Sequence, residues 1–477
     1  MTRNDYQIMT SLKTPVFTDL YELTMMQVWF QNGMKDRETC FDLFFRNCPF
    51  GGEYIIGAGI DDALSFLKRA RFSEHEINYL RSLELFDEDF LKWLSDWIFD
   101  GDVYAVNEGC VIFPHEPIIR IHGPLASCQL VETALLNLVN FQSLIATKSA
   151  RICSIAGWDA VLEFGARRAQ GPDGALSASK AAYIGGCAAT SNLKAGMAFD
   201  IPVRGTHAHS FVMSFGSEID AFRMYAESYP DATVLLIDTY DTLKCGLPNA
   251  ISVGKEMEIS GNTLAGIRLD SGDLLALSRE TRKKLDEAGM TSTKIVASGD
   301  LDEYVISSLT QNKAPIDTYG VGTRLVTGYD SPALAGVYKM SAIKNRDGIR
   351  EMRLKITDGK DKQSLPGIKQ AFRRYDTSGM MEQDTIELEE YSDNYDDAVP
   401  LLTLALSGGK LMREIKNVRL IREQVIQSFG KIPPVVSRIY NPEKYRVVIG
   451  PALKSAQKEV MQQYVPDPKK QQGYSTI

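Results

Sequence analysis

Two neighbouring histidines, His207 and His209, are the residues of this chain best suited to chemistry. They lie in the segment RGTHAH at 204–209, which follows the apolar run IPV at 201–203, so the segment begins where a buried strand is predicted to end. An imidazole titrates near neutral pH and is nucleophilic, so it can move a proton, accept a phosphoryl group or bind a metal. A lone loop histidine is more often an ordinary surface residue, and its interpretation therefore depends on the residues nearby.

The residues around these histidines show a repeating pattern of predicted strands and helices. Strands are predicted near Val203, Leu235, Ile267, Val296 and Tyr319, at spacings of about 23 to 32 residues, the length of one strand–helix unit. Helical patterns fit between them, the clearest from position 273 to 288 with a glycine as its stop. The pattern predicts parallel strands with helices outside, closed or partly closed into a barrel.

Polar or glycine-rich residues follow each of these predicted strands. In a barrel of parallel strands such ends meet on one face, where barrel active sites lie. Helix capping would account in part for Asp273 or Asp300, but it does not account for Arg268 or His209. The glycines suit a phosphate, because exposed backbone N–H groups can approach it closely. The strand ends are, in chain order, 206–209, Asp238–Asp241, Arg268 with Asp270–Asp273, Ser298–Asp300 and Gly320–Thr323.

A second basic stretch, EFGARRAQGPDG at 163–174, precedes the predicted strand at Val203. Adjacent arginines such as Arg167 and Arg168 are most often a solvated face, but their glycine-rich surroundings also fit a pocket for anions. Phe164 could stack on a planar ring or belong to the core, and core is the commoner role for a lone aromatic residue.

The HxH spacing of His207 and His209 is also compatible with a pair of metal ligands. In metal-dependent amidohydrolases an HxH pair closes the first barrel strand and further histidines follow later. Here the five histidines are at positions 75, 115, 122, 207 and 209, so the later ligands are missing and a metal hydrolase is disfavoured.

Composition limits the class of protein. The seven cysteines are scattered without a CxxC pair, which predicts reduced thiols and a cytoplasmic location. The net charge of −8 disfavours a nucleic-acid-binding protein. The amino-terminal residues lack a signal-like apolar region, and no run of roughly 18 apolar residues predicts a membrane span.

Changes in the pattern of predicted strands and helices divide the chain into three predicted domains. An amino-terminal α/β domain covers 1–149, the barrel covers 150–340 and a carboxyl-terminal domain covers 341–477. The third domain is predicted to begin near a hairpin turn at Asn345–Gly348 and to end in a disordered tail from residue 466.

Several segments taken together resemble one family, the nicotinate phosphoribosyltransferases, over nearly the whole chain. The resemblance implies an irregular TIM-like α/β barrel, an amino-terminal α/β domain and a carboxyl-terminal domain that packs back on it. It also implies a reaction that joins nicotinate to phosphoribosyl pyrophosphate (PRPP), giving nicotinate mononucleotide and pyrophosphate with coupled ATP hydrolysis. The segments are TDLY at 18–21, residues 41–46 and 163–174, GTHAHS at 205–210, IDTYD at 237–241, RLDSGD at 268–273, GVGT at 320–323 and PGIKQ at 366–370.

The resemblance further implies a role for each matching residue. His209 would be phosphorylated by ATP, and Asp238 would orient it and stabilise its charge; no catalytic role is implied for His207. Substrates would be bound by Tyr21, Phe164, Arg167, Ser191, Thr206, Arg268 and Asp270, with Tyr21 and Phe164 on the two faces of the pyridine ring. Phosphate and pyrophosphate would be bound by Arg46, Gly299, Asp300, Gly320, Gly322, Thr323 and Lys369.

Cofactors and partners are implied by the same resemblance. ATP and Mg²⁺ are expected, the latter carried by the phosphate substrates rather than by a metal site of the protein. A homodimer is expected, with each active site completed by Tyr21 of the neighbouring subunit. The alternative substrate is nicotinamide, but the matching stretch Thr190–Asn192 has no acid to accept the amide, which favours nicotinate. A non-catalytic protein on this scaffold is disfavoured because His209, Asp238 and Arg268 are all present.

Overall fold

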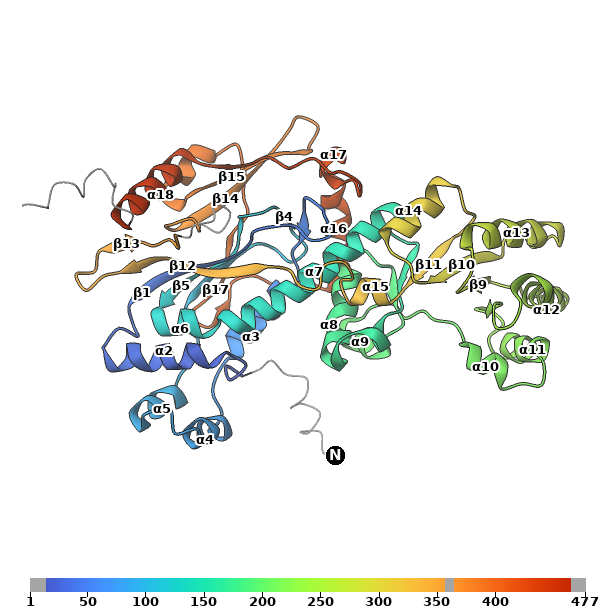
Figure 1. Cartoon of the computed structure of the whole chain (residues 1–477), viewed down its shortest axis with the longest axis horizontal. Coiled ribbons are helices and arrows are strands. Elements are labelled where there is room, and N and C mark those ends of the chain that lie inside the picture. Colours follow the sequence, from blue (N-terminus) through green and yellow to red (C-terminus); the bar gives the residue numbers. More distant parts are fainter. Residues whose placement is uncertain (1–13, 357–363, 465–477) are drawn as a thin grey trace, which may run out of the picture. The chain divides into compact units, whose positions relative to one another are not determined.

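The computed structural model describes residues 14–356 and 364–464, and the chain divides into two compact units (Figure 1). The first unit combines the chain up to residue 144 with 333–416 and the residues from 427 on, and the second combines 145–332 with 417–426. The carboxyl-terminal part of the chain therefore returns to the unit built by the amino-terminal part, as expected. The limits of the three predicted domains stay predictions, and the predicted tail from 466 lies outside the described residues.

A seven-stranded sheet in the order β13-β12-β1-β5-β3-β17-β18 joins the two ends of the chain in the first unit. β12 pairs antiparallel with β1, and β17 pairs antiparallel with β3. The predicted hairpin is confirmed, because β12 and β13 pair across Asn345–Gly348. The strands of this unit are β1 Glu38–Phe45, β2 Ile55–Ile56, β3 Asp102–Ala105, β4 Val111–Ile112, β5 Pro117–Pro124, β12 Gly336–Lys344, β13 Arg350–Met352, β14 Lys369–Tyr375, β15 Met381–Leu388, β16 Val399–Pro400, β17 Thr403–Ser407, β18 Lys410–Leu411 and β19 Val447–Ile449.

Helices of the first unit bury apolar faces in its core, and α18 packs on a separate four-stranded sheet in the order β16-β14-β15-β19. In α3, for example, Ala63, Leu64 and Leu67 are buried while both basic residues of the last turn point outward. The helices are α2 Leu20–Gln31, α3 Ile60–Arg69, α4 Glu74–Ser82, α5 Glu88–Ser95, α6 Leu125–Leu130, α17 Pro434–Ser437 and α18 Pro451–Tyr464, and α7 Glu132–Ala156 continues into the second unit.

The stretch Leu125–Ala156, which contains α6 and α7, is long and apolar enough by composition to cross a membrane. The stretch is not an unbroken apolar run, since it includes Glu132, Lys148 and Arg151. In addition, 67% of its most apolar window is buried inside the protein, as in a core helix.

The second unit contains a six-stranded parallel sheet in the order β7-β6-β11-β10-β9-β8. Val203 forms a parallel bridge to Thr190 of β7 and so lies at the outer edge of this sheet. All five predicted strand positions, Val203 and the four after it, are therefore confirmed in one sheet. Strands β6 and β7 were not predicted. The strands are β6 Val161–Glu163, β7 Ala189–Thr190, β8 Val234–Leu236, β9 Gly266–Leu269, β10 Lys294–Gly299 and β11 Thr318–Val321.

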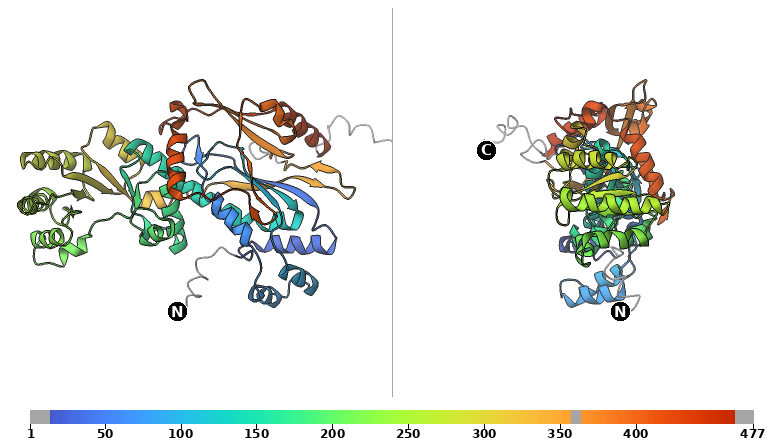
Figure 2. Two further views of the ribbon diagram at one scale, coloured as in Figure 1. Left: turned by 180° about the vertical axis from the view of Figure 1, so that it is seen from behind. Right: turned by 90° about the vertical axis from the view of Figure 1, so that its right-hand side faces the viewer.

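This sheet is an incomplete barrel. Among the described residues, its hydrogen-bonded order ends at Val203 on one side and at β8 on the other, and no strand ladder joins these two edges. Figures 1 and 2 show the chain crossing from α9 to α10 without regular structure. The irregular α/β barrel predicted from the sequence is therefore present with one open seam.

Helices cover the outer side of the sheet. The predicted helix after Arg268 is confirmed as α13, with Asp273 as its cap, Thr281 and Leu285 buried, and Gly289 at a φ of +77° past its end. The helices of this unit are α8 Gly171–Ile184, α9 Leu193–Phe199, α10 His209–Met213, α11 Glu218–Ser228, a π-helical turn Thr242–Gly246, α12 Leu247–Ile259, α13 Leu274–Glu287, α14 Glu303–Gln311 and α15 Thr323–Val326, with α16 Val418–Phe429 contributing its first turns.

Candidate active site

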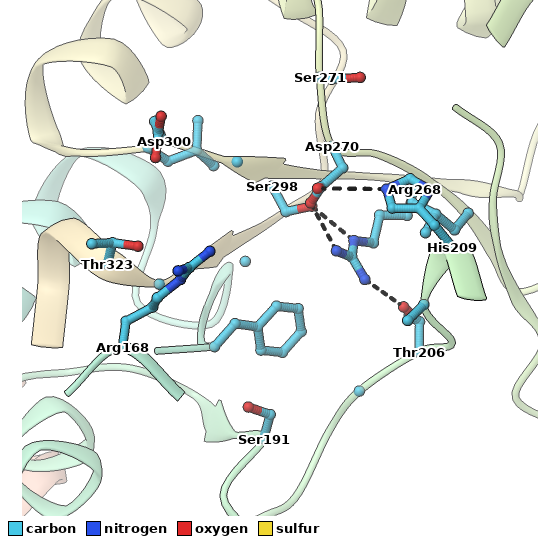
Figure 3. Close-up of a pocket in the computed structure, with 18 of the residues that line it drawn as sticks. Arg168, Ser191, Thr206, His209, Arg268, Asp270, Ser271, Ser298, Asp300 and Thr323 are labelled. Atoms are coloured by element: carbon cyan, nitrogen blue, oxygen red, sulfur yellow. Dashed lines mark hydrogen bonds and ion pairs between the residues drawn. The ribbon is translucent and has the colours of Figure 1, made fainter. Parts of the chain in front are cut away.

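A cavity of about 990 Å³ lies at the carboxyl ends of the parallel strands (Figure 3). Every residue that lines it belongs to the second unit, and each strand end contributes at least one of them except the end of β8 beyond Leu236. Of the residues expected in the site, twelve line the cavity: Phe164, Arg167, Ser191, Thr206, His209, Arg268, Asp270, Gly299, Asp300, Gly320, Gly322 and Thr323.

The guanidinium of Arg268 lies at the centre of the hydrogen bonding in this cavity. Its Nε donates to Ser298 Oγ at 2.7 Å, one Nη donates to Thr206 Oγ1 at 2.9 Å, and the other donates to Asp270 Oδ1 at 2.7 Å. Figure 3 shows it between Thr206 and the pair formed by Asp270 and Ser298. The side chain is only 14% exposed, so these partners fix its charge at one position facing the cavity.

Asp270 is held as an anion by its neighbours. Burial alone would raise the pKa of its carboxyl, but hydrogen bonds from Ser298 and Arg268 and the charge of Arg268 keep that pKa below its usual value. Oδ2 of Asp270 lies 3.9 Å from His209 Nε2, and Nδ1 of His209 lies 3.2 Å from Thr239 Oγ1. His209 therefore has a hydroxyl on one side and a carboxylate on the other.

The structure gives Asp238 no hydrogen bond to His209 among the described residues, and its expected role toward that histidine stays a prediction. Asp238 accepts hydrogen bonds from the Asp270 main chain at 3.0 Å and from Ser271 Oγ at 2.6 Å, and it does not line the cavity. The carboxylate of Asp238 thus orders the loop that follows β9. The side chains next to His209 are those of Asp270 and Thr239.

The ring of Phe164 forms one wall of the cavity. A Cβ at Gly320 would lie 2.5 Å from its Cδ2, so only glycine at 320 leaves room for the ring. The Arg268 guanidinium carbon lies 5.9 Å from the ring centroid. The ring is thus half-buried against the barrel while one part of it faces the cavity, which reconciles the two interpretations left open by the sequence.

A buried carboxylate, Glu163, orders the wall around Phe164 and Ser191. It accepts hydrogen bonds from the Gly165 main chain, from Ser179 Oγ at 2.8 Å and from Thr190 Oγ1 at 2.6 Å. Glu163 is fully buried and does not line the cavity, which leaves the Ser191 hydroxyl as the polar group of this wall. The structural role of this acid could not be predicted, because β6, the strand that ends in Glu163, was not predicted.

Arg167 and Arg168 extend from a 3-10 turn, Ala166–Arg168, on the side opposite Arg268. Figure 3 shows Arg168 and Arg268 pointing into the cavity from two sides. Within the part of the chain that the structure describes, neither Arg167 nor Arg168 has an acidic partner, so their charges are available to an anion. Arg168 and Ser298 were missed as site residues; the adjacent arginines gave a signal for the first.

The ends of β10 and β11 form a glycine-lined region of the cavity. Gly299 has a φ of +111°, and a Cβ there would lie 2.6 Å from the Asp270 carbonyl oxygen. The α14 cap is Asp302, which accepts from two main-chain N–H groups, so Asp300 is free of the capping role and lines the cavity. A close-approach backbone of this kind suits a phosphate group.

Three expected site residues belong to the first unit: Tyr21, Arg46 and Lys369. The ammonium of Lys369 is buried and donates to Asp42 Oδ2 at 2.7 Å and to two carbonyl oxygens at 2.8 Å each, and its expected contact with pyrophosphate stays a prediction. Arg46 is half-buried just past the end of β1. Tyr21 is 46% exposed on α2, and partial burial together with the neighbouring carboxylates raises the pKa of its phenol to about 12.

The cavity has few carboxylates for a metal. Among residues 14–356 and 364–464 no group of three or more His, Cys, Asp or Glu side chains is arranged to hold an ion. Asp270 and Asp300 alone line the cavity as acids. This donor set fits Mg²⁺ that arrives on a phosphate substrate, because such ions commonly take only one or two protein carboxylates.

His207 is placed quite differently from His209. It is 7% exposed, and its Nε2 accepts a hydrogen bond at 3.1 Å from the main-chain N–H of Leu236. Its ring packs against Phe211 and Tyr225, with centroids 5.3 and 4.8 Å away. Burial, opposed in part by a hydrogen bond to Ala208, lowers the pKa of His207 to about 4, and the charge of Arg268 acts in the same direction as burial.

Comparison with known proteins gives the family. A model of the nicotinate phosphoribosyltransferase amino-terminal domain matches residues 16–140, a model of the family itself matches 160–372, and a model of its carboxyl-terminal domain matches 393–457. The chain belongs to the nicotinate phosphoribosyltransferase family. The family resemblance seen in the sequence is therefore confirmed.

Individual members of the family are similar over most of the chain. The nicotinate phosphoribosyltransferase of Bacillus subtilis strain 168 is 46% identical over 356 residues, covering 75% of this chain and 72% of that protein. The enzyme of the same name from Homo sapiens is 33% identical over an aligned length of 518 residues, covering 92% of this chain and 95% of that protein.

Solved structures agree with this assignment. The crystal structure of human nicotinic acid phosphoribosyltransferase matches with a TM-score of 0.81 and 31% identity, covering 93% of this chain and 99% of that chain. The nicotinate-nucleotide pyrophosphorylase of Pyrococcus furiosus matches with a TM-score of 0.70 at 21% identity, over 90% of this chain and 97% of that chain, and shares the fold.

The lowered pKa of His207 predicts a pH dependence of stability. The unfolded chain binds this proton with a pKa near 6.5 and the folded chain near 4, so the stabilisation is complete above pH 6.5 and is lost as the pH falls toward 4. The free energy of unfolding of the wild type should fall by roughly 2–3 kcal/mol relative to His207→Phe between pH 7 and 4.5. Urea titrations of both proteins at the two pH values measure this difference. An equal fall in the free energy of unfolding of the wild type and of His207→Phe would contradict the prediction.

Proposed function

We propose that this chain transfers a phosphoribosyl group from PRPP to nicotinate, giving nicotinate mononucleotide and pyrophosphate, as part of NAD salvage. The observation that carries the proposal is the fixed guanidinium of Arg268 beside the face of Phe164, in a cavity of a chain of this family. A flat aromatic anion needs one apolar face to stack on and one cation for its carboxylate, and both are present at one position.

Nicotinate is preferred over nicotinamide in this proposal because of the groups that line the ring site. The Ser191 hydroxyl and the arginines can donate to a carboxylate, whereas an amide N–H needs an acceptor. The buried acid behind Phe164 and Ser191, Glu163, already accepts three hydrogen bonds and does not line the cavity. The cost of burying an unmatched amide donor would favour nicotinate.

The rest of the cavity supports the transfer step. Breaking the bond between ribose C1 and pyrophosphate leaves positive charge on the sugar and negative charge on the leaving group. Arg167 and Arg168, which lack acidic partners among the described residues, can stabilise the pyrophosphate, and Asp270 can face the ribose. The backbone at Gly299 and Gly322 is suited to the 5′-phosphate. Mg²⁺ bound with the pyrophosphate would add positive charge to the leaving group.

His209 is proposed as the acceptor of a phosphoryl group from ATP. If its Nδ1–H donates to Thr239 Oγ1, then Nε2 carries the lone pair that attacks the terminal phosphorus, and ADP departs. Asp270, 3.9 Å from Nε2, can stabilise positive charge on the ring. The phosphohistidine would couple ATP hydrolysis to the transfer.

Turnover of the purified protein tests the proposed activity. With PRPP and Mg²⁺, nicotinate should give its mononucleotide with a kcat/KM at least about tenfold above that for nicotinamide, because the amide leaves a buried donor unpaired. Mass spectrometry identifies the mononucleotide, with and without ATP. Equal or better use of nicotinamide would contradict the proposed substrate.

Replacing His209 tests the coupling to ATP. His209→Asn should abolish the acid-labile phosphoprotein formed from γ-labelled ATP and lower ATP hydrolysis at least about a hundredfold, since the nucleophile is removed. His75→Asn, which changes an exposed histidine of α4, should retain both activities. Labelling of His209→Asn at the wild-type level would show that another residue carries the phosphate.

A cytoplasmic homodimer with shared active sites is also proposed. The seven cysteines, all within the described residues, form no disulfide, which fits a reducing compartment. Leu20, Tyr21 and Val28 share one face of α2 and are 52%, 46% and 54% exposed, so this apolar face is available to a second subunit. In such a dimer Tyr21 of one subunit would cover the nicotinate ring bound against Phe164 of the other.

Subunit complementation tests the shared site. Tyr21→Ala and His209→Asn chains should each be inactive, and mixed dimers formed under subunit exchange should regain one intact site, up to about half of the normal activity per dimer. Exchange is verified with differently tagged chains. Verified exchange without recovered activity would show that Tyr21 and His209 serve the site of one subunit.

A further inference from the structure

The open seam of the barrel leaves a main-chain donor on β8 without a strand partner. Ile237 N donates to the Arg268 carbonyl oxygen on β9, so the N–H of the preceding residue, Leu236, points to the opposite edge of β8. In a closed barrel a neighbouring strand would accept that N–H. Among the described residues no main-chain group does so, and the N–H is buried.

The imidazole of His207 occupies the place of the missing strand. Its Nε2 accepts from Leu236 N at 3.1 Å across the seam, and Phe211, Phe222 and Tyr225 surround the ring. Because Nε2 is the acceptor, the neutral ring carries its proton on Nδ1, which lies 3.5 Å from the Ala208 carbonyl oxygen. One side chain thus satisfies the buried N–H of Leu236 at the edge of β8.

The same side chain fixes the loop that carries His209. On one side of this loop, Arg204 N donates to the Thr190 carbonyl oxygen at 3.0 Å. On the other side, the His207–Leu236 bond is followed two residues later by the contact of His209 with Thr239. The His207–Leu236 and His209–Thr239 contacts therefore join the same two segments at successive positions. A displacement of His207 would move His209 relative to both Thr239 and Asp270.

We propose that His207 is a positioning residue, which closes the barrel seam through Leu236 and thereby holds His209 in the geometry for phosphoryl transfer. The seam-closing part rests on the structure alone, and the positioning part rests on the proposed function. His207 itself need not touch a substrate for either part.

Two substitutions separate the hydrogen bond from packing. His207→Phe keeps an aromatic ring among Phe211, Phe222 and Tyr225 but removes the acceptor. His207→Gln places an amide oxygen near the position of Nε2 and keeps an acceptor. A role in packing alone would favour the phenylalanine, whereas a role as acceptor favours the glutamine.

Amide hydrogen exchange tests the seam without reference to activity. The Leu236 N–H should exchange at least about tenfold faster in His207→Phe than in the wild type, and His207→Gln should stay within about threefold of the wild type. Slow exchange of Leu236 in His207→Phe would overturn the seam-closing role.

Labelling by ATP and steady-state kinetics test the positioning. In folded His207→Phe the rate of His209 phosphorylation and the ATP-coupled kcat should fall at least about tenfold, with the KM for nicotinate within about threefold, because Arg268 keeps its hydrogen bonds to Ser298 and Asp270. His207→Gln should recover most of both rates. Equal impairment of the two variants, or full labelling of His207→Phe, would overturn the positioning role. A wild type that makes no mononucleotide would contradict the proposed function, while the exchange contrast would still decide the seam.

Discussion

The hydrogen bonds of one side chain, Arg268, are the interaction on which the site depends. A guanidinium presents its donors in a rigid planar fork, so three acceptors at fixed places define its position fully. Those acceptors, Thr206, Ser298 and Asp270, come from three different strand ends. The half-buried charge in turn needs the carboxylate of Asp270, which explains why the two side chains occur together in this chain.

The surrounding backbone is adapted to this arrangement. A Cβ at Gly320 would displace the Phe164 ring over which Arg268 lies, and a Cβ at Gly299 would collide with the carbonyl group of Asp270. Behind the ring wall, Glu163 takes three hydrogen bonds and fixes the turn that leads to Arg167 and Arg168. The hydrogen bonds of Glu163 therefore help to preorganise the cavity, although Glu163 itself does not line it.

Much of this could be predicted from the sequence because it depends on local pattern. The strands at Leu235, Ile267, Val296 and Tyr319 were visible as short apolar runs, and parallel strands place the residues after their carboxyl ends on one face. Strands β6 and β7 are two or three residues long and gave too little pattern to be found.

Residue roles were harder to predict because they depend on which neighbour a side chain meets. Asp238 could not be distinguished from Asp270 as the carboxylate nearest His209, since both come directly after adjacent strands. The pairing of Lys369 with Asp42 could not be predicted, because it brings together residues distant in sequence. The role of His207 required the open seam, and strand spacing alone could not show that the barrel would fail to close there.

Equilibrium binding to Arg268→Lys is the most direct measurement of the central claim, that one fixed guanidinium organises the site. A lysine keeps the charge but can satisfy only part of the three-acceptor arrangement. Titration calorimetry with nicotinate, at a protein concentration where circular dichroism shows an intact fold, should give an affinity at least about tenfold below that of the wild type. An affinity within about twofold of the wild type would show that charge alone suffices and would contradict the claim.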